Sequence, residues 1–210
     1  MTWTIVSLRD VRSVPWRNGG GTTRELLAIP NSDHWVWRIS IAEVESDGAF
    51  SHFAGVQRWL AILSGAGVRL MTPEHVIELT EASDPLVFNG ATPVQCELLQ
   101  GPVRDLNLML RCDDNLLVRR HVHSEGDNAH GPERCVGAMR RFCGAQRIRV
   151  EQATTVAIYA NQVSAILQID GGAQCVVAPA ALAWRALPAG AVLTCASSSA
   201  FLFEIENVQI

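Results

Sequence analysis

The most constraining feature of this 210-residue sequence is a short-period alternation of apolar residues, broken every few positions by glycine, proline, asparagine or aspartate. The clearest run is 35–44, where Trp35, Trp37 and Ile39 fall on one face and Arg38 lies on a smaller opposite face. Similar runs occur at 4–8, 22–29, 58–63, 68–71, 86–88, 94–99, 103–111 and 191–195. Because sustained helical periodicity is scarce, the pattern predicts an all-β sandwich or barrel.

One turn is unusually rich in glycine and in hydrogen-bond donors. Three consecutive glycines at 19–21 are costly to order, which suggests a backbone geometry that side chains would forbid. Successive N–H groups in such a turn can form an anion-binding concavity, so the turn is interpreted as a lip over a small polar or anionic ligand. A plain connection between two strands explains it equally well. The candidate binding residues here are Trp16, Asn18, Gly19, Gly20, Thr22 and Arg24.

Composition and short motifs exclude several function classes. The chain has no lysine, so Schiff-base chemistry is excluded. It contains neither a phosphate loop nor the glycine fingerprint of a dinucleotide site. The net charge is −4 and no basic run exceeds a pair of arginines, so no nucleic-acid partner is expected. Without a signal-peptide pattern or a long apolar stretch, we expect a cytoplasmic protein with no membrane partner.

The cysteines predict no cross-link. They are scattered, with no C-x-x-C spacing, at Cys96, Cys112, Cys135, Cys143, Cys175 and Cys195. A cytoplasmic protein rarely keeps disulfides, so we expect all six thiols to be reduced.

The two halves of the chain echo one another. Residues 61–68 resemble residues 167–174, and each copy gives a strand, a glycine turn and a returning strand. This indicates an internal duplication of a small β unit. The second copy has fewer polar residues on its inward face, so a binding site is expected in the first.

Five motifs follow one another along the first half of the chain: Pro-Trp-Arg-Asn-Gly-Gly-Gly-Thr-Thr at 15–23, Trp-Arg-Ile-Ser-Ile-Ala at 37–42, Ser-Asp-Gly-x-Phe-Ser-x-Phe-x-Gly-Val-x-Arg at 46–58, Leu-Ser-Gly-x-Gly at 63–67 and Gly-Pro-Val-Arg-Asp-Leu-Asn-Leu-Met at 101–109. In these motifs the sequence resembles the HutD/Ves family of the cupin superfamily, as a two-copy bicupin. Many members have Asp-Phe-Asn where this chain has Asp105, Leu106 and Asn107.

The resemblance implies two tandem cupin-like β-barrel or jelly-roll units. We expect an N-terminal unit at 1–112 with the ligand pocket, a polar linker or loop at 113–135, and a C-terminal unit at 136–210 completed by exchange with the first. It also implies a cytosolic protein linked to histidine utilisation, or to stress responses in the Ves branch. The family is thought to bind a pathway intermediate such as urocanate, and its members have no firmly assigned enzymatic activity.

Many cupins bind a metal through a His-x-His motif and a later carboxylate and histidine. At the corresponding strand this chain offers only His52, with Gln57 and Arg58 where further ligands would stand. A His-x-His does occur at His121 and His123, beside the polar stretch, and is interpreted as two solvated loop histidines. We therefore expect no metal and no cofactor.

The favoured ligand-binding set adds five residues from the less apolar faces of three strands to the turn: Arg38, Ser40, Arg58, Asp105 and Asn107. A buried arginine is unfavourable without a partner. Asp105 could pair with one guanidinium, and a ligand carboxylate could satisfy another in bidentate fashion. Asp105 or Asn107 would accept an imidazole N–H, and Trp16 could stack on the ring. Internal salt bridges, or arginines pointing to solvent, remain the alternative.

Two function classes follow. The first is a metal-free binding protein, a sensor or regulator that takes a small carboxylate such as urocanate. The second is a cupin enzyme, a hydrolase or isomerase acting on a small carboxylate metabolite. No nucleophile motif is present, so no catalytic residue is assigned, and the missing metal ligands favour the first class. The oligomeric state, a homodimer included, is left open.

Overall fold

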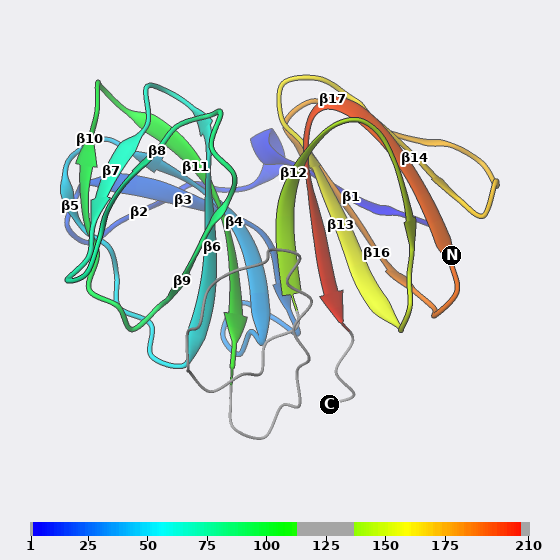
Figure 1. The fold of residues 1–210 in the computed structure, drawn as a ribbon, viewed down its shortest axis with the longest axis horizontal. Coiled ribbons are helices and arrows are strands. Elements are labelled where there is room, and N and C mark those ends of the chain that lie inside the picture. The colour runs from blue at the N-terminus through cyan, green and yellow to red at the C-terminus, as the bar shows by residue number, and fades with distance from the viewer. Residues whose placement is uncertain (1, 113–136, 207–210) are drawn as a thin grey trace. The chain divides into compact units, whose positions relative to one another are not determined.

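The computed structural model describes residues 2–112 and 137–206, and the expected linker at 113–135 lies outside them. The chain divides into two compact units. We call Val6–Arg111 the N-terminal unit, and Met1–Ile5 together with Cys112–Ile210 the C-terminal unit. The described residues form strands, turns and one short 3-10 helix, η1 (Leu8–Asp10), with no α-helix (Figure 1). The all-β prediction is confirmed.

The N-terminal unit consists of two antiparallel sheets. The six-stranded sheet has the order β2-β3-β4-β11-β6-β9, and the four-stranded sheet has the order β5-β10-β7-β8. The bounds of these strands are β2 (Val14–Pro15), β3 (Gly21–Ile29), β4 (Trp37–Val44), β5 (Gly48–Ala49), β6 (Val56–Ser64), β7 (Val68–Met71), β8 (Val76–Leu79), β9 (Leu86–Asn89), β10 (Gln95–Leu98) and β11 (Val103–Arg111).

The core of the N-terminal unit defines an inner face of the six-stranded sheet. Val44, Leu60 and Ile62 of that sheet cluster with Val68 and Leu70 of the four-stranded sheet. Side chains alternate along a strand, so residues at even steps from these share the inner face. Five predicted site residues lie on it: Arg38, Ser40, Arg58, Asp105 and Asn107.

A β-bulge in β3 changes which of its residues face inward. The register with β4 shifts between Glu25 and Leu27, so Glu25 lies opposite Ser40 while Ala28 lies opposite Arg38. An extra residue at a bulge reverses the alternation of the side chains.

Thr22 and Arg24 point to the outer face of the six-stranded sheet. They lie opposite Glu43 and Ile41, and not opposite the inward residues of β4. An unbroken alternation through 22–29 would put these two on the same face as Ala28, and the bulge is the reason that they lie on the opposite face.

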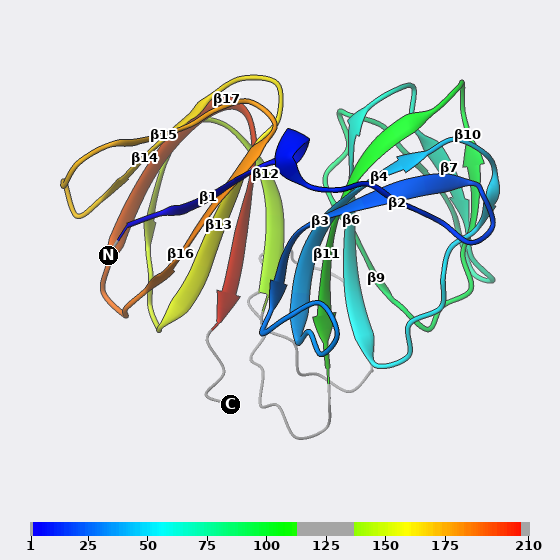
Figure 2. The same cartoon turned by 180° about the vertical axis from the view of Figure 1, so that it is seen from behind.

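The C-terminal unit is a single sheet of seven strands (Figure 2). Its order is β1-β16-β13-β17-β14-β15, with β12 paired to β17. The bounds are β1 (Thr4–Ser7), β12 (Gly137–Arg149), β13 (Thr154–Ala160), β14 (Ala165–Ile169), β15 (Cys175–Val177), β16 (Ala181–Leu187) and β17 (Val192–Glu206). Its core cluster is wholly apolar, with Leu167, Ala183 and Leu193 fully buried, and Trp3 packs against it. The residues of this core cluster therefore provide no polar side chain that could bind a ligand.

The cysteines differ from expectation at one position. Cys96, Cys143, Cys175 and Cys195 are free, whereas Cys112 is disulfide-bonded. The prediction of six reduced thiols is wrong at Cys112, because a disulfide depends on separation in space and not on spacing in the sequence. Cys135 lies outside the described residues. No helix in the described ranges is long and apolar enough to cross a membrane.

Candidate functional site

The candidate site is built on three neighbouring strands, β4, β11 and β6. Arg38 of β4 and Arg58 of β6 both lie opposite Met109 of β11, so they flank it on the inner face. We call Arg38 and Arg58 the arginine pair. Moving along β11, Asn107 occupies the next inward position and Asp105 the one after it. The sheet register therefore brings these four polar residues together, as the strand patterns predicted.

A chain of hydrogen bonds joins Arg58 to Asp105. Arg58 Nη2 donates to Asn107 Oδ1 at 3.3 Å, and Asn107 Nδ2 donates to Asp105 Oδ1 at 2.6 Å. We call these three residues the relay. All are buried, Arg58 and Asn107 with 6% of their surface exposed and Asp105 with 3%. Arg58 Nη1 also donates to the carbonyl oxygen of Ser51 at 3.3 Å.

Aromatic rings surround the arginine pair. The Arg58 guanidinium lies 5.3, 5.6 and 4.9 Å from the ring centres of Phe50, Phe53 and Phe88. The Arg38 guanidinium lies over Phe53 at 5.7 Å and over Trp35 at 5.2 Å. Such contacts stabilise a desolvated cation through the ring quadrupole. We call these four rings the aromatic collar.

The arginine pair is incompletely matched by carboxylates. Arg38 Nη1 lies 3.7 Å from Glu25 Oε2, whose other oxygen accepts a hydrogen bond from the Ser32 hydroxyl. Among the described residues, Arg58 has no carboxylate within ion-pair distance. The Nε atoms of Arg38 and Arg58 are buried and have no hydrogen-bond partner there. A buried donor without an acceptor is costly, so the pair favours an added anion.

Burial shifts the pKa values of the charged groups. It lowers the pKa of Arg58 to about 10; the charge of Asp105 opposes this and that of Arg38 adds to it. Burial also lowers the pKa of Arg38, against the charge of Glu25. Burial raises the pKa of Asp105 to about 7, opposed by Arg58, the Ala42 N–H and Asn107. Near neutral pH Asp105 is about half protonated, so the site carries an excess of positive charge.

The glycine turn lies far from the arginine pair. Gly21 lies opposite Val44 at one end of the β3–β4 ladder, and Ala28 lies opposite Arg38 near the other. Val44 and Arg38 are six residues apart, roughly 20 Å along a strand. The expectation of a glycine lip over these arginines is wrong, because the antiparallel register places Val44, and not Arg38, beside the turn.

The turn also uses its own donors. Gly19 N donates to the Trp16 carbonyl at 3.1 Å, and Gly20 N donates to Asn18 Oδ1 at 3.1 Å. Gly19 has φ +72°, and a Cβ on Gly21 would lie 2.2 Å from the Glu43 carbonyl oxygen. The glycines therefore serve a tight strand connection.

Two other predicted residues have structural partners of their own. Trp16 Nε1 donates to Thr23 Oγ1 at 2.8 Å, and its ring packs against the core. Arg24 and Arg104 both donate to Glu43 Oε1 on the outer face, at 3.0 and 2.9 Å. Burial raises the pKa of Glu43, but the two arginines together lower it by more, so the net effect is a lowered pKa. Thr22 shares the outer face with Arg24, so neither joins the arginine pair.

The donor set does not fit a transition metal. Guanidinium groups are not ligands, and Asp105 is the one carboxylate in the relay. In the described part of the chain, no three His, Cys, Asp or Glu side chains gather in a group that could hold an ion. His52 is exposed, and His121 and His123 fall outside the described residues. We derive no step through a metal.

Sequence reasoning missed the aromatic collar and Glu25. The signal for the collar was present, because Phe50 and Phe53 belong to the motif that ends at Arg58. The strand patterns gave the faces of the strands, whereas the collar comes partly from the segment between β5 and β6. Nothing in the sequence pattern placed Glu25 inward, since the bulge decides its face.

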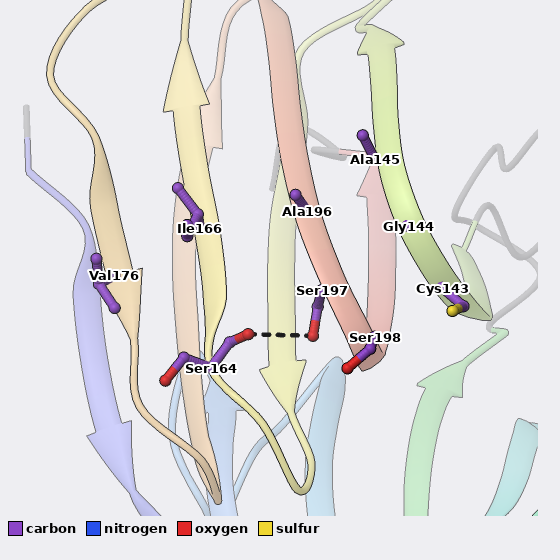
Figure 3. A pocket seen from close by; sticks show the side chains of 9 residues that line it. All are labelled: Cys143, Gly144, Ala145, Ser164, Ile166, Val176, Ala196, Ser197 and Ser198. Carbon is purple, nitrogen blue, oxygen red and sulfur yellow. Dashed lines mark hydrogen bonds between the residues drawn. The ribbon is translucent and has the colours of Figure 1, made fainter.

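An open pocket of about 550 Å³ lies on the C-terminal unit (Figure 3). It is lined by residues of β12, β14, β15 and β17 with the neighbouring Ser164, and none of them is charged. Ile166 and Val176 in it are 42% and 61% exposed. Ser197 Oγ donates to the Ser164 carbonyl, so one of its few polar groups is already satisfied. The pocket lacks a group that could select an ionic ligand.

A family model described as HutD matches residues 8–184. An "uncharacterized 21.2 kDa protein in hutC 3'region" of Pseudomonas putida is 32% identical over 158 residues, which is 74% of this chain and 72% of the relative. Protein Ves of Cronobacter sakazakii is 38% identical over 108 residues, and that match spans 50% of this chain and 60% of Ves.

Two solved structures have a fold similar to that of this chain. HutD from Pseudomonas fluorescens SBW25, in a formate condition, superposes with a TM-score of 0.77 and 26% identity over 98% of both chains. A cupin 2 conserved barrel domain protein from Leptotrichia buccalis gives a TM-score of 0.55 and 12% identity over 97% of this chain and 96% of its own, which shows the fold alone. The all-β fold with two tandem units is thus cupin-like, and the chain belongs to the HutD family.

Proposed function

We propose that this chain is a cytoplasmic binding protein for a small carboxylate that carries a nitrogen heterocycle, with urocanate as the first candidate. It would act as a sensor or regulator in histidine utilisation. The family and a relative from the hutC 3' region support the link to that pathway. The observation that carries the proposal is the arginine pair under its aromatic rings, with Arg58 buried, Arg38 half-buried and no carboxylate within ion-pair distance of Arg58 in the described residues.

The proposed pose follows from the chemistry of the site. A ligand carboxylate would accept hydrogen bonds from the guanidinium groups, which match it in shape and charge. The rings of Phe53 and Phe88 would flank a planar conjugated ligand, a role that replaces the stacking first assigned to Trp16. Asp105 or Asn107 would accept the imidazole N–H.

One observation favours a second candidate, an enzyme acting on the same ligand class. The pKa of Asp105, raised to about 7 by burial, suits a general acid or base near neutral pH. Perturbed carboxylates also occur in purely structural networks, so this supports the enzyme only weakly. Following the absorbance of urocanate with protein present separates turnover from binding.

The first prediction tests the site through ligand-induced stability. Urocanate at ~100 times its dissociation constant should stabilise the protein by about 2.7 kcal/mol, seen as a rise in Tm. Arg58→Ala should lose most of that rise, because a charge-assisted contact contributes about 1.5–3 kcal/mol.

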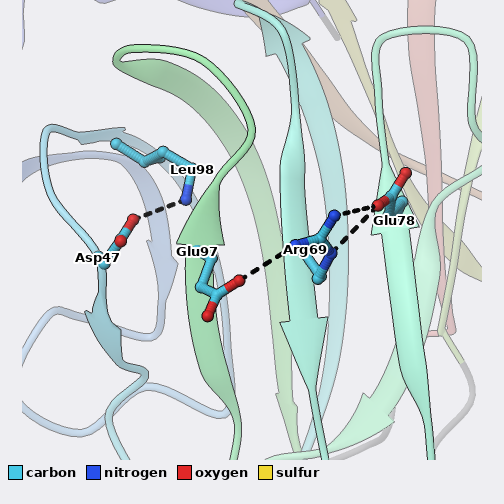
Figure 4. Close-up of polar contacts among 5 residues, drawn as sticks. All are labelled: Asp47, Arg69, Glu78, Glu97 and Leu98. Atoms are coloured by element: carbon cyan, nitrogen blue, oxygen red, sulfur yellow. Dashed lines mark hydrogen bonds and ion pairs between the residues drawn. The ribbon is translucent and has the colours of Figure 1, made fainter.

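Arg69→Ala is the matched control for Arg58→Ala. Arg69 lies on β7, 43% exposed, where it pairs with Glu78 at 2.8 Å and Glu97 at 3.3 Å (Figure 4). It should leave the urocanate-induced rise intact. A melt that does not move with urocanate contradicts the ligand assignment, and an equal rise in wild type and Arg58→Ala contradicts the site.

A further inference from the structure

Asp105 is a buried carboxylate that has no direct ion pair among the residues that the structure describes. Its acceptor oxygens are served by Asn107 Nδ2 at 2.6 Å and by the backbone N–H of Ala42. Its nearest counter-charge is Arg58, which reaches it through the Asn107 side chain. The charge of Asp105 therefore depends on Arg58 for its compensation.

The direction of the relay is fixed by chemistry. A guanidinium only donates hydrogen bonds and an ionised carboxylate only accepts them. Asn107 must present its oxygen to Arg58 and its amide nitrogen to Asp105, as the structure has it. Anything that engages Arg58 from the other side thus acts on a group that compensates Asp105.

We propose that binding of a carboxylate at the arginine pair is coupled to the uptake of one proton by Asp105, so that the site takes the anion and the proton together. This inference rests on the proposed function. A ligand carboxylate on Arg58 neutralises the guanidinium and adds a second negative charge near Asp105. Both effects disfavour the ionised form of a buried carboxyl group. The proton comes from solvent and bonds to a carboxylate oxygen of Asp105.

Two other titratable groups interact with the charge of Asp105, and both have pKa values well above the range from pH 6 to 8. Burial lowers the pKa of Arg58 only to about 10. Burial raises the pKa of Cys96, which lies on β10 across the core, to about 12, and the charge of Asp105 adds to it. From β3 the site receives Glu25, which is paired with Arg38. Asp105, whose pKa burial raises to about 7, is therefore the group poised to change charge between pH 6 and 8.

The test is titration calorimetry of the full chain in pairs of buffers with different ionisation enthalpies. The probes are urocanate and trans-cinnamate, which keeps the planar carboxylate but has a phenyl ring that does not titrate. With Asp105 mostly ionised at pH 8, close to one proton should be taken up per ligand, and only a small fraction at pH 6. The affinity for cinnamate should be about tenfold weaker at pH 8 than at pH 6.

Two variants assign the proton. Asp105→Asn keeps the size of the side chain but cannot titrate, so its cinnamate binding should take up no proton and lose its pH dependence. Asp47→Asn is the control, because Asp47 only accepts a hydrogen bond from the Leu98 N–H at 2.7 Å (Figure 4). It should take up protons as the wild type does.

A third readout keeps the test decisive if Asp105→Asn binds poorly or fails to fold. In the wild type, the NMR signal of the Asn107 side-chain amide should titrate with a midpoint near the Asp105 pKa of about 7, and saturating ligand should move that midpoint upward. Ligand binding that takes up no proton, that leaves this midpoint unchanged, or whose uptake persists in Asp105→Asn overturns the coupling alone. If neither carboxylate binds at any pH, the proposed function fails and the coupling with it.

Discussion

In the N-terminal unit, a few buried charged residues lower the stability of the fold. Asp105 is enclosed on every side, yet it keeps a carboxyl group whose pKa burial raises to about 7. The positive charge of Arg58 opposes that rise, but Arg58 is linked to Asp105 only through two hydrogen bonds to the Asn107 side chain that lies between them. An ionised Asp105 is therefore held at a cost, and that cost depends on pH.

We expect this cost to appear as a pH-dependent free energy of unfolding. The native pKa of Asp105 lies above its ordinary value, so between about pH 4 and 7 the native state binds more protons than the unfolded state. Stability from this group is then lost as pH rises, and the loss is complete above the native pKa. Relative to wild type, Asp105→Asn should gain about 2–3 kcal/mol between pH 5 and 8. Urea unfolding at both pH values measures it, with Asp47→Asn showing no comparable gain.

At the scale of elements, the face of a strand on which a residue lies could be predicted from the sequence, whereas the register between strands could not. The alternation within 103–111 placed Asp105 and Asn107 on the correct face, and 35–44 did the same for Arg38. These faces are local properties of a strand. The bulge near Leu26 and the distance between the glycine turn and Arg58 depend on pairing between strands, which no single run of residues encodes. For that reason five of the sequence-predicted residues, from Asn18 to Arg24, lie away from the arginine pair.

The third prediction concerns the first residue of β3. Gly21→Ala would bring a Cβ within 2.2 Å of the Glu43 carbonyl oxygen, so the β3–β4 ladder must open at that end. We expect a loss of about 2 kcal/mol or more in the free energy of unfolding, measured with urea. Gly48→Ala in β5 is the control, because its Cβ would meet no atom within 4 Å. A Gly21→Ala protein as stable as Gly48→Ala would show that the ladder end can relax.

At the scale of the whole molecule, a segment that comes first in the sequence belongs to the sheet of the second unit. β1 follows directly after the first few residues, but it pairs with β16 in the sheet of the C-terminal unit. Trp3 packs against the core of that unit, among residues from beyond position 140. The internal echo of the sequence could not reveal this, since it compares segments and not their partners.

The fourth prediction follows from that packing. Trp3→Ala should destabilise the C-terminal unit by about 2 kcal/mol, less than a fully buried tryptophan would, because Trp3 is only partly buried. Hydrogen exchange should speed up in β13 and β16 and stay unchanged in β6 and β11. Ile5→Ala, in the same segment but with Ile5 49% exposed, should leave the exchange rates of β13 and β16 near those of the wild type. Faster exchange confined to β6 and β11 would contradict this arrangement.

The placement of β1 also has a consequence for synthesis on the ribosome. β1 emerges before the other described strands, and its partner β16 (Ala181–Leu187) is translated more than 170 residues later. At elongation rates of about 5–20 residues per second, β1 waits roughly ten to thirty seconds with its hydrogen-bonding edge unpaired. During that interval the nascent chain presents a strand that other chains can capture, so early chaperone binding at residues 2–7 would protect the yield of native protein.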